Sequence, residues 1–195
     1  MSEKKVIQRT PVGEAKWAHV QKPKPSYSDP KGRFKTKEQF EIEIHFNPAD
    51  PTWKPWYDDL VKKWAAIPTQ KDEEGDPIKK QKPLNKELDE AGKETGRVFV
   101  KFATGTQFPP GVFDKYGQPL TALVGNGSKV KVAYTENVYE GFGGGINLYL
   151  SGVQVIELVP YGDKSAKSLG FETETPPADG ALPPSDVNGN ENPFN

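Results

Sequence analysis

Four stretches of this chain alternate apolar and polar residues with a period of two, and no other feature constrains the fold as strongly. In the clearest stretch, residues 40–46, four apolar residues alternate with two glutamates and a histidine. The alternation recurs in residues 97–104, 129–136 and 146–159, and residues 17–20 are interpreted as the start of a further strand. Such alternation is typical of half-buried β-strands. The sequence therefore predicts five strands.

One segment follows a helical period instead. In residues 52–67, large apolar residues recur every three or four positions, namely Trp53, Trp56, Leu60, Trp64 and Ile67. This spacing predicts a helix whose tryptophan stripe faces the core. Pro68 ends the helix, because proline cannot continue the hydrogen-bond pattern. Residues 69–96 are polar and charged, and they predict a long charged loop that is mobile or folded as a hairpin.

Five strands and one helix favour a mainly β domain, and a five-stranded OB-fold barrel is the arrangement that fits best. We place this domain at residues 15–162. Residues 1–14 are polar and predict a flexible N-terminus. Residues 163–195 are rich in Pro, Gly and acids, and they have too little apolar area to form a core. They predict a disordered acidic tail.

The composition argues against an enzyme. The chain has no Cys and only two His, so thiolate chemistry, disulfides and His-based metal sites have few or no residues to use. The glycine-rich residues 141–145 lack the Lys-Ser/Thr of a phosphate loop and precede a strand. We therefore expect no catalytic residue, no metal and no cofactor. The first thirty residues show no signal peptide, and no apolar run is long enough to span a membrane. We therefore do not expect the protein to bind a membrane.

The charge is distributed unevenly along the chain. Residues 1–40 hold ten Lys and Arg against four acids, whereas residues 161–195 hold two Lys against six acids. A basic head and an acidic tail indicate a polyanionic ligand and a tail that can imitate it. The alternative is that the asymmetry serves solubility alone.

Strand phase selects the candidate binding residues. If Val100 and Phe102 point inward, then Phe99 points outward between Arg97 and Lys101, because side chains alternate along a strand. Single-stranded nucleic acid is bound by cations along its backbone and by aromatic rings that stack on its bases. The outward faces of the two later strands add Lys129, Lys131 and Tyr149 to the candidates. The alternatives are that Phe99 packs under residues 69–96 and that the two lysines protect an edge strand.

Loops supply further candidates of the same two kinds. The loop aromatics are Phe108, Phe113, Tyr116 and Phe142, and a basic run near the N-terminus interleaves an aromatic in the same way, with Arg33, Phe34 and Lys35. The mixture of cations and aromatics predicts contacts with single-stranded DNA from loops as well as from strands.

Three segments in order then resemble a known family. Residues 109–120 contain Pro-Gly-Val-Phe-Asp, residues 127–134 form a basic strand, and residues 145–155 run from a glycine into Val-Gln-Val. Together they resemble the OB-fold single-stranded-DNA-binding proteins of tailed bacteriophages. The similarity covers about residues 97–160, whereas the N-terminal half matches that family only in layout.

The resemblance implies a protein that coats single-stranded DNA with little sequence preference during replication, recombination or repair, in the cytoplasm of an infected bacterium. It also implies an acidic tail whose terminal aromatic contacts replication or recombination proteins. Here that residue is Phe194, which is followed by Asn195. Two alternatives stay open: a single-stranded-RNA-binding OB protein, and a β-barrel adaptor or virion component that binds only protein. A homodimer is also left open.

Overall fold

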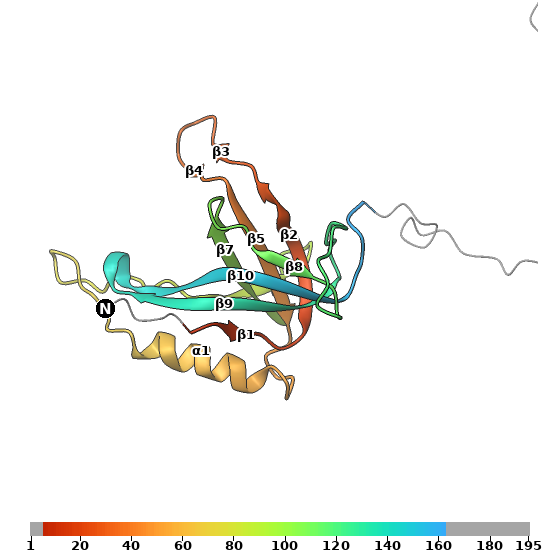
Figure 1. Cartoon of the computed structure of the whole chain (residues 1–195). Helices are drawn as coiled ribbons and strands as arrows, with labels where there is room; N and C mark the ends of the chain where they lie inside the picture. Colours follow the sequence, from red (N-terminus) through yellow and green to blue (C-terminus); the bar gives the residue numbers. More distant parts are fainter. Residues whose placement is uncertain (1–5, 163–195) are drawn as a thin grey trace, which may run out of the picture. The chain divides into compact units, whose positions relative to one another are not determined.

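The computed structural model, shown in Figure 1, describes residues 6–162. Five of its strands form a closed ring. The ring runs from β9 through β2, β5, β7 and β10 back to β9. These strands are β2 (Gly13–Lys24), β5 (Gln39–Phe46), β7 (Glu94–Gly105), β9 (Lys129–Tyr139) and β10 (Gly145–Glu157). Their pairing is antiparallel except between β7 and β10, which pair in parallel through Ala103 and Tyr149. The predicted five-stranded OB-fold barrel with one helix is confirmed.

Shorter elements extend this ring. The helix α1 spans Lys54–Ala66 and follows β5, and a 3-10 turn, η1 (Gly141–Gly143), joins β9 to β10. β1 and β8 pair with ring strands, β6 pairs with β7, and β3 and β4 form a separate hairpin between β2 and β5. Their bounds are β1 (Gln8–Arg9), β3 (Tyr27–Ser28), β4 (Lys35–Thr36), β6 (Leu84–Leu88) and β8 (Gly111–Phe113).

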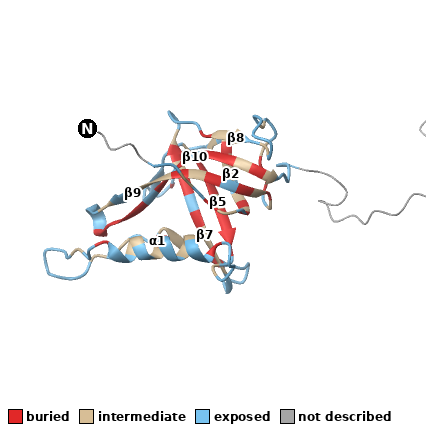
Figure 2. Cartoon of the chain, turned by 60° about the horizontal axis from the view of Figure 1, so that its bottom comes forward, coloured by how far each residue is buried: buried red, intermediate tan, exposed pale blue. Residues whose placement is uncertain are grey.

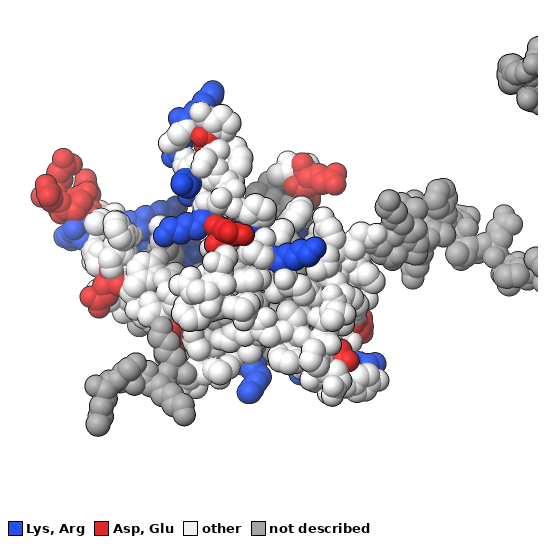
Figure 3. Space-filling view, turned by 45° about the horizontal axis from the view of Figure 1, so that its top comes forward, with Lys and Arg blue, Asp and Glu red and all other residues white. Residues whose placement is uncertain are grey.

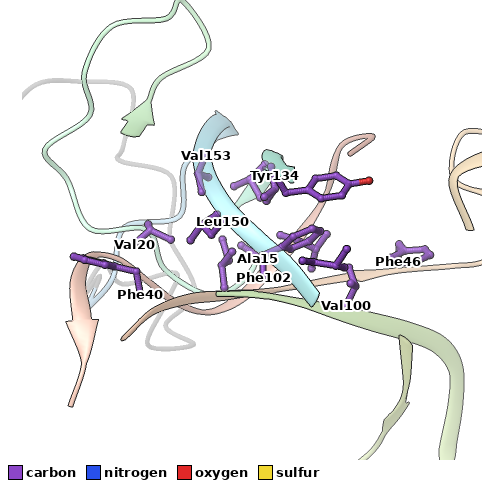
Figure 4. Close-up of a cluster of buried hydrophobic side chains, with 14 of the residues drawn as sticks. Ala15, Val20, Phe40, Phe46, Val100, Phe102, Tyr134, Leu150 and Val153 are labelled. Atoms are coloured by element: carbon purple, nitrogen blue, oxygen red, sulfur yellow. The ribbon is translucent and has the colours of Figure 1, made fainter. Parts of the chain in front are cut away.

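The alternation in the sequence sets which side chains enter the barrel. Ile42 and Ile44 of β5 and Val100 and Phe102 of β7 have no exposed surface. Apolar residues of the other ring strands are buried with them: Figure 2 shows the buried parts of the strands, and Figure 4 shows Val100 and Phe102 in this cluster. The predicted inward phase is therefore correct. Glu41 also has almost no exposed surface, although it lies on the outer face of β5. The Glu41 side chain points away from the barrel interior, yet it is shielded from solvent because neighbouring side chains cover it.

The helix packs against the barrel through its tryptophans, as predicted. Trp53 stacks on Phe46 with ring centroids 3.9 Å apart, and Leu60 is buried. The indole N–H of Trp53 donates to the Val12 carbonyl, and that of Trp56 donates to the Tyr134 hydroxyl. Both polar atoms are thus satisfied inside the core. No helix within residues 6–162 is long and apolar enough to cross a membrane.

The N-terminal segment carries more regular structure than the sequence indicates, and residues 69–96 include a strand. Strand β1 and the start of β2 lie within residues 1–14, so the prediction of a flexible N-terminus is wrong for this part of the chain. The sequence contains no sign of β1, because a strand of two residues has no detectable alternation. Strand β6 lies within residues 69–96 and pairs with β7, so this excursion takes the hairpin form, one of the two that the sequence predicted. The predicted tail at residues 163–195, with Phe194, lies outside the described residues.

Candidate nucleic-acid interface

Two adjoining hollows form a groove over β7 and the first half of β10. The first, of about 570 Å³, is lined by residues that include Lys82, Lys101 and Asn147. The second, of about 810 Å³, is lined by residues that include Phe108 and Ser151. Because both hollows are lined by Thr104, Gly105 and Tyr149, we treat them as one surface, the β7–β10 groove.

The β7–β10 groove suits a polyanion with flat rings. None of the described residues that line it is Asp or Glu, in a chain that has 27 acids. Lys82 and Lys101 supply positive charge, and Phe108, Tyr139 and Tyr149 supply aromatic surface. Phe108 is largely exposed and Tyr149 is partly exposed. These are the two side-chain types that bind single-stranded nucleic acid.

Two further hollows continue along the second half of β10. One, of about 370 Å³, is lined by residues that include Arg9, Phe113, Lys131 and Gln154, and again by no described acid. We call it the Arg9–Lys131 hollow. The next, of about 390 Å³, contains Tyr116 but also Asp114 and Glu157. Among the described residues that line these four hollows, Asp and Glu occur at the hollow beside the C-terminal end of β10 and not at the other three.

Cations on the neighbouring faces of β2 and β7, including Lys101 of the groove, are paired with carboxylates within the fold. Glu41 of β5 accepts hydrogen bonds from Lys101 at 2.6 Å, Lys24 at 2.8 Å and Gln39 at 2.7 Å. Burial alone would raise the pKa of Glu41, but these three hydrogen bonds outweigh it and lower the pKa to about 2. Glu41 is thus an anion at neutral pH, and it is paired with Lys101, one cation of the groove.

A second buried carboxylate, that of Glu87 of β6, interacts with several basic side chains at the other end of these faces. It lies 2.7 Å from both the Lys16 ammonium and His45 Nδ1, and 3.5 Å from the Arg97 guanidinium. Burial would raise its pKa, but hydrogen bonds from Lys16, Thr95 and His45 lower it to about 2. Arg97 also lies 3.2 Å from Glu14, which is 3.5 Å from Lys129.

The candidate binding residues on β7, β9 and β10 therefore fall into separate groups. Lys101 and Tyr149 line the groove together, and Lys131 lines the separate Arg9–Lys131 hollow. Phe99 has the predicted outward phase but is half-buried, stacked on His45 at a centroid distance of 5.0 Å. Arg97 and Lys129 join the ionic cluster around Glu14 and Glu87.

The loop candidates lie in separate places. Arg33, Phe34 and Lys35 lie in and around the β3–β4 hairpin, on which Lys and Arg gather (Figure 3). Arg33 pairs with Asp29 at 2.8 Å, while Phe34 is exposed beside Tyr27, 5.7 Å away between ring centroids. Phe142 lies in η1 between β9 and β10, with 94% of its surface exposed and a φ of 54°. In OB folds, the loops at these two positions often contact oligonucleotides.

Sequence reasoning missed several exposed or groove-lining residues. Arg9 lies in the predicted flexible N-terminus, and Lys82 lies in the predicted charged loop. Tyr139 comes just after residues 129–136, where the sequence predicts a strand. Trp17 is 59% exposed at an irregularity of β2, with a φ of 51° and its backbone N–H donating to the Asn126 side chain. A tryptophan outside the helical stripe was the available signal for it.

Comparison with solved structures places this fold among those of phage single-stranded-DNA-binding proteins. The chain superposes on gp2.5, a single-stranded DNA binding protein encoded by bacteriophage T7, with a TM-score of 0.56 and 19% identity, over 90% of this chain and 100% of that chain. The single-stranded DNA-binding protein from bacteriophage Enc34 in complex with ssDNA gives 0.54 and 16%, over 80% and 89%. No family model matches the sequence, and no curated protein matches it significantly.

Proposed function

We propose that this protein binds single-stranded DNA in the β7–β10 groove, with little sequence preference and without catalysing a reaction. The observation that carries the proposal is a groove with lysines and aromatics and with no acid among its described lining residues. Cations there neutralise phosphates, and rings stack on bases of any sequence. The solved structures of similar fold support it, since they are phage single-stranded-DNA-binding proteins and one of them is in complex with ssDNA.

The biological setting is part of the same proposal. A protein that coats single strands serves replication, recombination or repair of phage DNA, in the cytoplasm of the infected bacterium. The acidic tail, residues 163–195, would contact replication or recombination proteins through Phe194, and its charge has the same sign as DNA. Pull-down of replication proteins by the full chain, compared with its Phe194→Ala variant, tests the tail contact.

A titration of the full chain with oligo-dT tests the binding itself. We expect log affinity to fall linearly with log salt, with a slope of about −0.7 for each phosphate neutralised. Tyr149→Ala should weaken binding by about 1–3 kcal/mol, the effect of one stacked base. Tyr161→Ala, which removes an exposed tyrosine that lines neither hollow of the groove, is the matched control.

The outcomes separate the proposal from its alternatives. Equal affinity for oligo-U of the same length would favour a single-stranded-RNA-binding protein. Absence of salt-dependent affinity for either polymer would favour a β-barrel adaptor that binds only protein. If Tyr149→Ala binds like the parent, single strands do not use the β7–β10 groove.

A further inference from the structure

The N-terminal strand places an arginine beside Lys131. Thr10 N–H donates to the Val132 carbonyl at 2.9 Å, and the Val132 N–H donates to the Thr10 hydroxyl at 3.0 Å. These two bonds fix β1 against β9, with Arg9 opposite Ala133. Because Lys131 lies two residues before Ala133 on the same face of β9, both cations line the Arg9–Lys131 hollow.

These two cations differ from three other cations of β7 and β9. Arg97, Lys101 and Lys129 all lie within 3.5 Å of a carboxylate. Between residues 6 and 162, neither Arg9 nor Lys131 makes an ion pair or a side-chain hydrogen bond, and both are exposed. Their full charge is therefore available to an anion that enters the hollow.

An aromatic ring and small residues complete the hollow. Phe113 is partly exposed, and its ring lies over Gly111, where a Cβ atom would come within 2.7 Å of the ring. Ala133, Gly117 and Gly152 also line the hollow, so short side chains border the space in front of this ring. A flat ligand can approach it without displacing a large side chain.

We propose that the Arg9–Lys131 hollow is a second nucleotide subsite, in which Arg9 and Lys131 bind backbone phosphate and a base stacks on Phe113. This inference rests on the proposed function and extends it. Tyr149 of the groove and Gln154 of the hollow are five residues apart on β10, which is roughly 16 Å along a strand. A bound single strand therefore follows the outer face of β10 from the groove into the hollow.

Oligonucleotide length distinguishes this subsite from the groove. We would measure affinities of the full chain for oligo-dT of about 4 and about 16 nucleotides, the range of site sizes known for OB folds. The test variant is Phe113→Ala/Lys131→Ala. The matched control is Tyr161→Ala/Lys62→Ala, which removes one exposed aromatic and one exposed lysine outside the subsite.

We expect the test variant to bind the longer oligonucleotide about tenfold or more weakly, the effect of at least one stacked base. Its salt slope for that oligonucleotide should be shallower by about 0.7, for one phosphate lost. The shorter oligonucleotide should change less than twofold, because it is accommodated in the groove. Tyr149→Ala should weaken both lengths.

Three results would overturn the subsite. They are an unchanged affinity of the test variant for the longer oligonucleotide, an equal loss for both lengths, and a loss no larger than that of the control variant. If the parent chain binds neither length, the proposed function fails and the subsite fails with it. Binding of both lengths by the parent, with no length-selective loss in the variant, overturns the subsite alone.

Discussion

Replacing Glu41 with glutamine should strengthen the binding of single-stranded DNA. Glu41 is buried beneath the β7–β10 groove and accepts hydrogen bonds from Lys101 and Lys24. Glutamine has nearly the same shape and keeps one oxygen acceptor, but it has no charge. Because Lys24 and Lys101 bond to different oxygens of Glu41, the amide keeps an acceptor for only one of them, but it removes the anion that competes with a DNA phosphate for both.

The magnitude follows from the geometry. The Lys101 ammonium lies 2.6 Å from Glu41, so a phosphate oxygen bound about 2.8 Å away on its far side would be roughly 5 Å from the carboxylate. Repulsion at that distance is about 3 kcal/mol at an effective dielectric constant of 20 and about 0.8 kcal/mol in water. Since the Lys101 side chain is 39% exposed, we expect an intermediate value of about 1–2 kcal/mol, or roughly 5- to 30-fold in affinity.

Titration with oligo-dT at low and high salt measures this effect. The gain from Glu41→Gln should be largest at low salt and should shrink as salt screens the interaction. Glu136→Gln is the matched control, because Glu136 pairs with Lys63 of α1 at 2.9 Å and its removal changes the net charge equally. Unchanged or weaker binding by Glu41→Gln at low salt, with Glu136→Gln behaving like the parent, would refute the reasoning.

Two further predictions concern acid stability and the tail. The pKa values of Glu41 and Glu87 are lowered to about 2 in the folded chain, so the unfolded chain takes up protons first as pH falls. Stability should thus be complete above about pH 5 and decline toward pH 2; thermal unfolding across this range measures it, and an equal decline in Glu41→Gln would contradict the assignment to Glu41. Deleting residues 163–195 should tighten oligo-dT binding at low salt, because that segment carries six acids against two lysines; equal affinity of both forms there would exclude competition by the tail.

The sequence predicted the barrel phase but not the partners of its outer residues. Alternation placed Val100 and Phe102 inside and Phe99 and Lys101 outside, as the structure shows. It could not show that Phe99 meets His45, since that contact depends on the pairing of β5 with β7. Periodicity reports the face of a side chain, whereas its neighbours across the sheet depend on strand order and register.

The candidate site was harder to predict for the same reason. The ion pairs of Glu87 with Lys16 and of Glu14 with Arg97 join residues 71 and 83 positions apart in the chain. No local pattern reveals such pairs, so every outward lysine or arginine looked equally free. Arg9 escaped notice because a two-residue strand has no detectable period, although Thr10 fixes it to β9.

Closure of the barrel depends on a short seam, because β7 and β10 pair directly only through Ala103 and Tyr149. Both residues line the β7–β10 groove, so a ligand there would touch both sides of the seam. If a ligand binds more tightly when the seam is closed, then the bound ligand also stabilises the closed seam, and the two free-energy gains are equal. Backbone amides of β7 and β10 would then exchange with solvent more slowly in the complex than in the free protein.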